Sequence, residues 1–388
     1  MGARARDYFE MKLLLVSSSS GSRGGGELYL LYLGRAMAAR GHSVTLWCST
    51  HPRMDELCAL FAPIGAVVRA DYTNMYDRRL RSIASYLDGA SARAAAASFR
   101  ALAPDFIHLN KQNLEDALDL QRAVVLSGVP SLATIHITQS AVYLRAKTAG
   151  LRDWISRRAL NAYPGALVAV LEQRARDLRD FLGEQPRIHA VANGVELYDL
   201  HQCDAIRTAK RAELGIAPST LLLAAVGRMV PQKRPLVFLE TAARIHARVP
   251  HARFIWVGDG PLAAEWDAWV AQRGLGAIIQ RIGWQRNVRD FLFAADSFLH
   301  TAEFEGLPLA ILEALSAQLP CAITPNLLAE MPFLDATNSI SIGDDGTWAE
   351  VLNDPARLAA LGANARALAE REFSFDIMAA RYEALYRV

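Results

Sequence analysis

The sequence is short of the residue patterns that mark metal and disulfide proteins. Its four cysteines are scattered and form no Cys-x-x-Cys pair, and its nine histidines show no His-x-x-His or His-Glu-x-x-His spacing. These absences argue against a zinc site and against a disulfide scaffold, and they fit a reducing compartment. We therefore expect a cytoplasmic protein that needs no metal and no cofactor.

Long hydrophobic runs and a strong net charge are also missing. The longest apolar stretches, such as Leu221–Val226, have the length of a strand, whereas a membrane-spanning helix needs roughly 18 residues or more. The 42 basic and 40 acidic residues almost cancel, so the net charge does not indicate nucleic acid as a partner. With 52% hydrophobic and 21% charged residues, the chain has the composition of a globular protein. Its 388 residues suggest two or three domains.

Two stretches of the chain have the same strand–helix–strand pattern, which implies parallel strands joined by a crossover helix. They are Lys12–Ser17, Gly26–Arg40 and Val44–Cys48 in the first half, and Leu221–Gly227, Pro235–Arg248 and Arg253–Val257 in the second. Further strands alternate with helices after each start: Phe106–Leu109, Ser131–Ile135, Ala166–Val170, Arg187–Val191, Ile278–Ile282, Ser297–Thr301, Pro320–Ile323 and Ser339–Ile342.

This alternation predicts an α/β protein with two Rossmann-like domains, each an open parallel sheet with helices on both faces. We place the domains at residues 11–193 and 194–372, with a polar, charged stretch running from the boundary to about Gly215. The last helix, within residues 373–388, has no strand after it and is expected to pack back on the first domain. Ligands of such sheets bind beyond the carboxyl ends of the strands, which predicts a cleft between two facing domains.

The loop Ser17–Glu27 is rich in serine and glycine and immediately precedes a helix. Gly25 and Gly26 let the backbone approach a ligand, and the start of the helix offers free N–H groups and the positive end of its dipole. A phosphate group would suit this loop. A flexible surface loop is the alternative.

The loop Gly227–Arg234 follows another apolar strand and holds two cations. Arg228 and Lys233 lie five positions apart, close enough for both to reach a diphosphate, and they would neutralise it as a leaving group. A solvated basic turn is the alternative interpretation.

The loop Thr301–Pro308 leads into a helix with an apolar stripe. Glu305 lies in this loop and Glu313 lies in the helix, so the two carboxylates could bind two hydroxyl-rich parts of one ligand, such as a sugar and a ribose. A glycosidase acid/base pair is less favoured, because both residues come from one short segment. An ordinary helix face with solvated glutamates is the remaining alternative.

His136 follows an apolar strand of the first half. That position would place its imidazole at the mouth of the cleft, where it could donate a hydrogen bond to an oxygen of a sugar. A lone histidine after a strand is more often structural.

Together these segments resemble the retaining glycosyltransferases of family 4, which have the GT-B fold. Glu305–Ala314 resembles the E-x7-E motif of the family, and Gly227, Arg228 and Lys233 resemble its G-R-x(n)-K diphosphate clamp. The glycine loop with the helix after it, and the segment Val191–Glu196, resemble the N-terminal glycine loop and the interdomain hinge of the family.

The resemblance implies a metal-independent transfer of a hexose from a UDP- or GDP-linked sugar to a hydroxyl of a glycan or lipid-linked acceptor, with retention of configuration, in cell-envelope or exopolysaccharide synthesis. It implies that the second domain binds the donor and the first domain binds the acceptor. The implied catalytic residues are His136, Glu305, Arg228 and Lys233, and the implied donor-binding residues are Gly25, Gly26, Gly227, Arg228, Lys233, Glu305, Gly306, Leu307 and Glu313.

Two segments depart from the family pattern. Thr324–Glu330 has no glycine where the family has a glycine-rich loop, and Asn338–Ile340 replaces an Asn-Gly-hydrophobic step. Both lie in the expected donor domain and leave the identity of the sugar open. A sugar-nucleotide epimerase with a GT-B-like fold, a phosphorolytic enzyme and a non-catalytic nucleotide-sugar-binding subunit are the alternatives.

The segments Asp71–Leu87 and Ser140–Arg158 are candidate acceptor-binding insertions of the first domain. A basic, aromatic face made by them could dock on an anionic membrane surface, which would make the protein peripheral to the cytoplasmic membrane. A solvated helix face is the alternative. The residues concerned are Tyr72, Tyr76, Arg78, Arg79, Arg81, Tyr86, Tyr143, Arg145, Lys147, Arg152, Trp154, Arg157 and Arg158.

Overall fold

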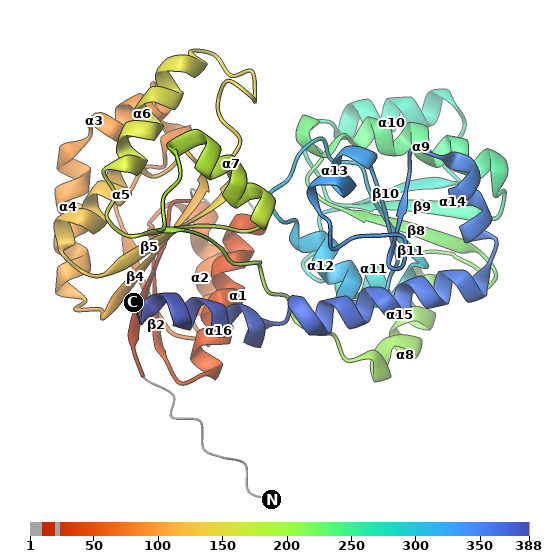
Figure 1. The fold of residues 1–388 in the computed structure, drawn as a ribbon. Helices are drawn as coiled ribbons and strands as arrows, with labels where there is room; N and C mark the ends of the chain where they lie inside the picture. Colours follow the sequence, from red (N-terminus) through yellow and green to blue (C-terminus); the bar gives the residue numbers. More distant parts are fainter. Residues whose placement is uncertain (1–9, 20–23, 388) are drawn as a thin grey trace, which may run out of the picture. The chain divides into compact units, whose positions relative to one another are not determined.

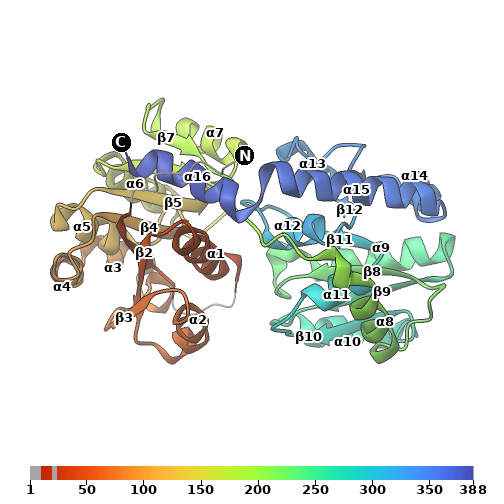
Figure 2. The ribbon, with the colours of Figure 1, turned by 90° about the horizontal axis from the view of Figure 1, so that it is seen from below.

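The computed structural model describes residues 10–19 and 24–387, and these fall into two compact units: the described residues up to 194 together with 375–387, and residues 195–374 (Figures 1 and 2). Residues 20–23 of the predicted glycine loop lie outside the described residues. Each unit is an open parallel sheet with helices on both faces. In the described part of the chain, no helix is long and apolar enough to cross a membrane.

The sheet of unit 1 has seven parallel strands. Across the sheet they run β3 (Ala66–Ala70), β2 (Ser43–Ser49), β1 (Lys12–Ser17), β4 (Phe106–Asn113), β5 (Ser131–Ile137), β6 (Ala166–Ala169) and β7 (Ile188–Ala190). The helices of the unit are α1 (Gly25–Ala39), α2 (Asp55–Phe61), α3 (Arg81–Leu87), α4 (Gly89–Ala101), α5 (Leu118–Ser127), α6 (Ala149–Asn161), α7 (Glu172–Leu182) and α16 (Phe375–Tyr386), with short 3-10 turns at Pro52–Met54 and Met75–Asp77.

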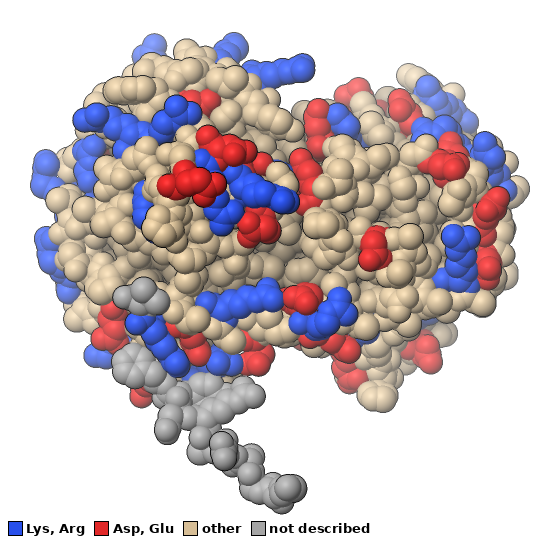
Figure 3. All heavy atoms as spheres, in the orientation of Figure 1, with Lys and Arg blue, Asp and Glu red and all other residues tan. Residues whose placement is uncertain are grey.

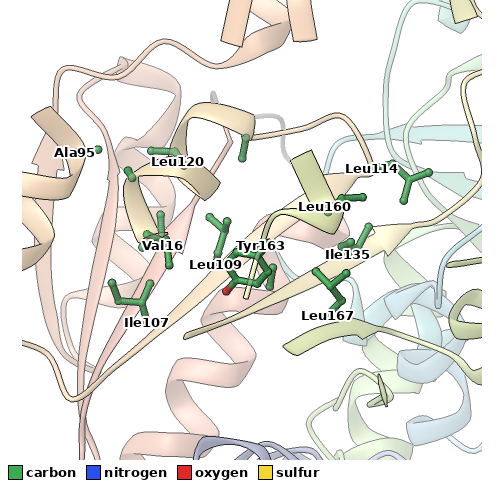
Figure 4. Packing of buried hydrophobic residues seen from close by; sticks show 14 of the residues in the cluster. Val16, Ala95, Ile107, Leu109, Leu114, Leu120, Ile135, Leu160, Tyr163 and Leu167 are labelled. Carbon is green, nitrogen blue, oxygen red and sulfur yellow. The ribbon is translucent and has the colours of Figure 1, made fainter. Parts of the chain in front are cut away.

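The strands of unit 1 are buried on both faces because each face is covered by a layer of helices. Leu14 and Val16 of β1 point into a core shared with α4, α5, α6 and α7, while Leu13 and Leu15 point into a core shared with α1, α2 and α16. Figure 4 shows the first of these cores, where strand residues meet Leu120 of α5 and Leu160 of α6. The alternation of side chains along a strand produces these two cores from one apolar run.

Helix α16 follows unit 2 in the sequence but packs in unit 1 beside α1 (Figure 2). Glu383 of α16 accepts hydrogen bonds from Arg40 Nε at 2.6 Å and from Arg40 Nη2 at 2.9 Å, and it lies 3.0 Å from His42 Nε2. Arg40 holds the pKa of Glu383 at about 2. The hydroxyl groups of Tyr382 and Tyr386 reach Thr134 Oγ1 at 3.0 Å and His108 Nδ1 at 2.7 Å in the buried core. The terminal helix is therefore an integral part of the unit 1 core that also contains α1 and α2.

The sheet of unit 2 has six parallel strands. They run β10 (Ile279–Gly283), β9 (Ala252–Val257), β8 (Leu221–Val226), β11 (Ser297–His300), β12 (Cys321–Ile323) and β13 (Ser339–Ser341). Its helices are α8 (Cys203–Glu213), α9 (Pro235–Arg248), α10 (Ala263–Gln272), α11 (Arg289–Ala294), α12 (Leu309–Ser316), α13 (Pro325–Glu330), α14 (Asp345–Leu352) and α15 (Pro355–Glu372), with 3-10 turns at Leu200–Gln202 and Pro231–Lys233.

Two elements differ from the expectations. The strand β3 was not predicted; it is a half-exposed edge strand containing Arg69, so its apolar signal is weak. The charged stretch after residue 194 contains the helix α8 rather than a plain linker. Arg207 and Arg211 of α8 attach the helix to unit 2 through Asp296, at 2.5 and 3.3 Å. The buried residue of α8 is Arg211, so no apolar stripe marks the face that packs on unit 2.

Both sheets change direction at the same point of their order. In unit 1, β1 has β2 on one side and β4 on the other, and in unit 2, β8 has β9 and β11. Such topological switch points open a crevice at the carboxyl ends of the two strands, where α/β proteins bind ligands. The loops after β1 and β4, and after β8 and β11, therefore lie where a ligand is expected to bind.

Candidate functional site

The loops after β8 and β11 are joined by hydrogen bonds at the switch point of unit 2. Thr301 Oγ1 donates to the carbonyl oxygens of Lys233 at 3.1 Å and Arg234 at 3.2 Å. Glu303 N donates to Gln232 O at 2.8 Å, and Gln232 Nε2 donates to Phe304 O at 3.0 Å. Side chains from two loops far apart in the sequence are thus held at one end of the sheet.

Lys233 and Glu305 meet as an ion pair between these loops. Burial would raise the pKa of Glu305, but Lys233 and His300 outweigh burial and lower that pKa from 4.5 to about 2. Glu305 is therefore an anion at every working pH, although only 6% of its surface is exposed. A buried carboxylate can accept hydrogen bonds from the hydroxyl groups of a sugar.

His300 is a neighbour of this pair that the sequence analysis did not single out. It lies at the end of β11, and its Nε2 is 3.2 Å from Glu305 Oε1. Burial lowers the pKa of His300, so the ring is neutral, and Nε2–H donates because a carboxylate can only accept. A histidine at the carboxyl end of an apolar strand was the available signal.

Arg228 is the second cation of the predicted clamp, and it differs from Lys233 in its surroundings. It is exposed, and its side chain has no partner among the described residues. An unpaired arginine beside a paired lysine leaves a planar donor group ready for an anion. Glu313 is buried in α12, one helix turn and a half beyond the loop. Burial raises the pKa of Tyr198, and the negative charge of Glu313 raises it further. Gly306 and Leu307 are buried beneath the loop between Glu305 and α12.

The loop that carries Arg228 rests on the turn Gly258–Asp259–Gly260. Met229 N donates to Asp259 O at 2.8 Å, and a Cβ on Gly258 would lie 2.0 Å from Gly227 O. Gly258 has φ of +142°, a conformation that disfavours other residues. This turn therefore has a structural role: its backbone supports and positions the loop that carries the cations.

Replacing Gly258 by Ala is expected to destabilise unit 2 by about 3 kcal/mol, because the new Cβ meets a backbone oxygen and strains φ. Gly274→Ala is the matched control in the same unit: φ is +65°, but nothing lies within 4 Å of its Cβ, so about 1 kcal/mol of strain is expected alone. Urea unfolding measures both variants. Equal losses would show that the contact with Gly227 is unimportant.

In unit 1, the structure places His136 differently from the expectation. It lies inside β5 rather than after it, and it is buried. Asn110 Nδ2 donates to Gly26 O at 3.0 Å, which turns Asn110 Oδ1 toward His136 Nε2 at 2.7 Å. Burial lowers the pKa of His136 to about 4, so the ring is neutral and Nε2–H is the donor to Asn110. That N–H is already used inside unit 1, so it is not free to donate to a sugar as expected.

The helix α1 starts at Gly25, directly beside this histidine network. A Cβ on Gly26 would lie 2.1 Å from Gln112 Oε1, the flexible end of a β4 side chain, which would have to move to make room. Tyr29 of α1 lies edge-on to His136, with ring centroids 4.8 Å apart. Asn110 and Gln112 were missed by the sequence analysis, although polar residues ending an apolar strand were a visible signal. Asn110 thus links Gly26 of α1 to His136 of β5 through hydrogen bonds.

The predicted basic face of unit 1 loses two of its arginines to internal ion pairs. Arg78 donates to Asp88 at 3.0 Å and to Asp119 at 2.6 Å, and Arg152 Nε donates to Glu115 at 2.7 Å. Tyr72 is buried as well. These residues hold the segments in place and are largely buried. As for metal ions, no group of three or more His, Cys, Asp or Glu side chains that could hold one occurs among the residues described.

The two doubly wound units, each with a polar cluster at its switch point, define a GT-B protein of the α/β class. A family model described as Glycosyltransferase Family 4 matches residues 23–198, and one described as Glycosyl transferases group 1 matches residues 220–360. The chain belongs to the family 4 type of glycosyltransferases.

Individual relatives agree with this family. One is UDP-Gal:alpha-D-GlcNAc-diphosphoundecaprenol alpha-1,3-galactosyltransferase of Escherichia coli, 27% identical over 52% of this chain and 53% of that protein. Another is the putative glycosyltransferase EpsF of Bacillus subtilis (strain 168), 28% identical over 54% of each. The chain thus spans about half the length of these curated relatives.

Solved structures show the fold over nearly the whole chain. HepE of Anabaena, in complex with UDP and glucose, superposes with a TM-score of 0.76 at 17% identity, over 97% of this chain and 100% of that one. Sucrose-phosphate synthase from Thermosynechococcus elongatus superposes with a TM-score of 0.73 at 18% identity, over 97% and 98%. At these identities the likeness concerns the fold alone.

Proposed function

We propose that this chain transfers a hexose from a nucleoside diphosphate sugar to a hydroxyl of a glycan or lipid-linked acceptor, with retention of configuration and without a metal ion. The observation that carries the proposal is the fastening of the two loops after β8 and β11, which brings Lys233, Glu305 and Arg228 to one switch point. A cation pair for a diphosphate and an anion for a sugar are what this reaction needs.

Each residue then has a role. Arg228 and Lys233 bind the diphosphate and stabilise it as the bond between the sugar and the phosphate oxygen breaks. Glu305, held by His300, accepts hydrogen bonds from the sugar, and Glu313 binds the ribose. The acceptor oxygen attacks the anomeric carbon from the side that the diphosphate leaves, and its proton passes to a phosphate oxygen. No protein base is needed for this step, in keeping with the neutral, already bonded His136.

The comparisons support the chemistry of the substrates. The Escherichia coli relative is named for UDP-Gal and a diphosphoundecaprenol acceptor, and the Anabaena neighbour was solved with UDP and glucose. By analogy we infer a UDP-linked hexose as the donor, with a GDP-linked sugar as the alternative. A polyprenyl diphosphate glycan is the favoured acceptor, which would place the reaction in bacterial polysaccharide synthesis at the cytoplasmic face of a membrane.

The test is to incubate the protein with a panel of UDP- and GDP-sugars, with and without polyprenyl-linked acceptors, and to measure nucleotide release. We expect acceptor-dependent release with one nucleotide, unchanged by EDTA, and a product whose anomeric configuration by NMR matches the donor. Conversion of the donor to another sugar nucleotide would identify an epimerase. Tight nucleotide binding with no turnover for any pair would identify a non-catalytic binding subunit, and either result would overturn the proposal.

A further inference from the structure

Two cysteine side chains of unit 1 lie in contact, although the sequence contains no Cys-x-x-Cys pair. Cys48 is the penultimate residue of β2, and Cys58 lies one turn into α2. Their Sγ atoms are 3.5 Å apart, which is van der Waals contact for two sulfur atoms. Among the described residues no other cysteine sulfurs touch, since Cys203 lies in α8 and Cys321 in β12 without such a contact. The pair has no local sequence signature because its members lie ten positions apart, one on a strand and one on a helix.

The turn that brings the two cysteines together is held by a residue of the neighbouring strand. After Cys48 the chain leaves β2 and turns back into α2. Arg69 of β3 lies beside Cys48 in the sheet register, and its Nη2 donates to Thr50 O at 2.8 Å and to His51 O at 3.0 Å. Its Nη1 donates to Asp55 Oδ1 at 2.7 Å, at the start of α2. The turn therefore has a fixed course.

The helix α2 is held in place by its own apolar side chains. Leu57 and Phe61 are buried in the core that α2 shares with α1 and α16. Phe61 packs tightly on α1, since a Cβ on Gly34 would lie 2.6 Å from Phe61 Cε2. Cys58 lies between these two anchors, so it cannot turn away from Cys48 unless α2 leaves the core. The contact between the thiols is therefore a feature of the packed unit.

The two thiols differ in their access to solvent. Cys48 is 0% exposed, whereas Cys58 is half-buried at the surface of α2. Burial and the neighbouring Cys58 raise the pKa of Cys48 to about 12, and the charge of Arg69 opposes this rise. Arg69 also interacts electrostatically with Cys58. A reagent from solvent therefore meets Cys58 first, beside a positive charge, while Cys48 stays a protonated thiol behind it.

We propose that Cys48 and Cys58 form a redox-sensitive pair that closes to a disulfide on oxidation by a small disulfide of the glutathione class, and that the bond locks α2 onto β2. A disulfide bond measures about 2.05 Å, so the sulfurs must approach each other by about 1.5 Å, which small rotations about the Cα–Cβ bonds supply. Disulfides in a reducing compartment are usually transient and redox-sensing. A half-exposed thiol next to a second thiol that resolves its oxidation product is the arrangement that such a sensor needs.

The oxidation takes place in two exchange steps. In the first, the sulfur of Cys58 attacks one sulfur of oxidised glutathione, the S–S bond breaks, and one glutathione leaves as a thiol with the proton of Cys58. In the second, the sulfur of Cys48 attacks the Cys58 sulfur of this mixed disulfide, and the second glutathione leaves with the proton of Cys48. Two electrons pass from the cysteine pair to oxidised glutathione, which becomes two molecules of reduced glutathione.

The surface around α2 carries charges of both signs. Figure 3 shows Lys and Arg beside Asp and Glu in the lower part of unit 1, where Figure 1 places α1, α2 and α16. Mixed charges produce no strong field that would repel a small anion such as glutathione. The inference goes beyond the proposed function and does not depend on it, because oxidation of the pair requires neither donor nor acceptor.

The first experiment equilibrates the full chain with oxidised and reduced glutathione, blocks the remaining thiols and maps the peptides by mass spectrometry. Trypsin cleaves after Arg53, so it separates the two cysteines into peptides 41–53 and 54–69. We expect these two peptides to be joined by a disulfide that dithiothreitol opens again. A glutathione adduct that persists on Cys58 would overturn the proposal, as would free thiols on both peptides at every glutathione ratio.

Three variants separate the two steps. In Cys48→Ala, Cys58 can react but cannot close the bond, so the reaction should stop at the glutathione adduct. In Cys58→Ser, the buried Cys48 should stay a free thiol. Cys203→Ser is the matched control, because it removes a half-buried thiol of unit 2 and should form the linked peptides like the wild type. A glutathione adduct on Cys48 in the Cys58→Ser variant would contradict Cys58 as the thiol that reacts first.

The second experiment measures what the bond does to unit 1. The disulfide closes a loop of about ten residues, which should lower the equilibrium constant for unfolding of unit 1 about 100-fold. Amides of β2 that exchange by unfolding should then exchange more slowly by the same factor, while those of unit 2 should not change. By linkage, the equilibrium constant for disulfide formation with glutathione should be larger by this factor in the folded chain than in urea. Equal exchange rates in the oxidised and reduced protein, or equal equilibrium constants in the folded and unfolded chain, would show that the fold does not favour the bond and would overturn the proposal.

Discussion

Replacement of Lys233 by Met is expected to lower kcat for sugar transfer by about 10²–10³-fold, the usual loss when one charge-stabilising group of a leaving group or oxyanion is removed. Lys233 lies at the switch point of unit 2, paired with Glu305. A diphosphate arriving there would meet a cation whose position is already set by Thr301 and Glu305, so little reorganisation is needed when charge develops. The measurement is the initial rate of nucleotide release with the donor that the panel identifies.

The same variant should also destabilise unit 2, and this effect has to be separated from catalysis. Without Lys233 the buried carboxylate of Glu305 loses its counter-charge, which costs about 3 kcal/mol or more. In the double variant Lys233→Met/Glu305→Gln no charge is left buried, so most of the stability should return while transfer stays slow. Arg228→Gln is the complementary variant: it removes an exposed, unpaired cation, so it should impair donor binding and leave urea unfolding unchanged. Recovery of transfer in the double variant would contradict the role of Lys233 in catalysis.

Replacing Lys233 by Met should reverse the way in which Glu305 makes the stability depend on pH. In the wild type its pKa is about 2, so its contribution is complete above the ordinary pKa near 4.5 and is lost as the pH falls toward 2. In Lys233→Met, burial is no longer outweighed, and the pKa of Glu305 should lie above the ordinary value. That variant should therefore lose stability as the pH rises from 4 to 7, whereas the wild type should not. Urea unfolding at both pH values decides between the two.

The parts of the fold that could be predicted are those that local pattern determines. The strand Lys12–Ser17 and the helix Pro235–Arg248 were predicted with the bounds that the structure has, because the first is an uninterrupted apolar run and the second has an apolar period, each with a clear end. The loops after β8 and β11 could be singled out because charged residues after an apolar strand stand out. The edge strand β3 was missed because it is largely exposed, and the helix α8 was missed because its buried residue is Arg211 rather than part of an apolar stripe.

The rest of the site depends on contacts between residues distant in the sequence. Glu305 is linked to Lys233 across 72 residues, and His136 is bonded to Asn110 across 26. Arg78 and Arg152 looked like surface cations because Asp119 and Glu115, which pair with them, lie 41 and 37 residues away. Whether a charged side chain is free or paired depends on the order of the strands in the sheet. The spacing of residues along a short stretch of sequence does not predict it.

Replacement of Tyr382 by Ala is the second change with a large expected effect, and it should act on unit 1 alone. Tyr382 is fully buried in α16, hydrogen-bonded to Thr134 Oγ1 at 3.0 Å, with its ring centroid 4.9 Å from that of His108. Removing a buried aromatic side chain costs about 3–5 kcal/mol. Tyr382→Phe keeps the packing and loses the hydroxyl hydrogen bonds, so about 1 kcal/mol is expected.

Because α16 follows unit 2 in the sequence but completes the core of unit 1, a chain ending at Ser374 should show the same effect in full. Unit 2 should unfold as in the intact protein, since residues 195–374 form it without α16. Unit 1 should lose its cooperative transition, because the truncation exposes the core that α16 shares with α1 and α2. Amide hydrogen exchange resolves the two units separately. Protection of β1 and β4 retained in both Tyr382→Ala and the truncated chain would show that unit 1 folds without its terminal helix.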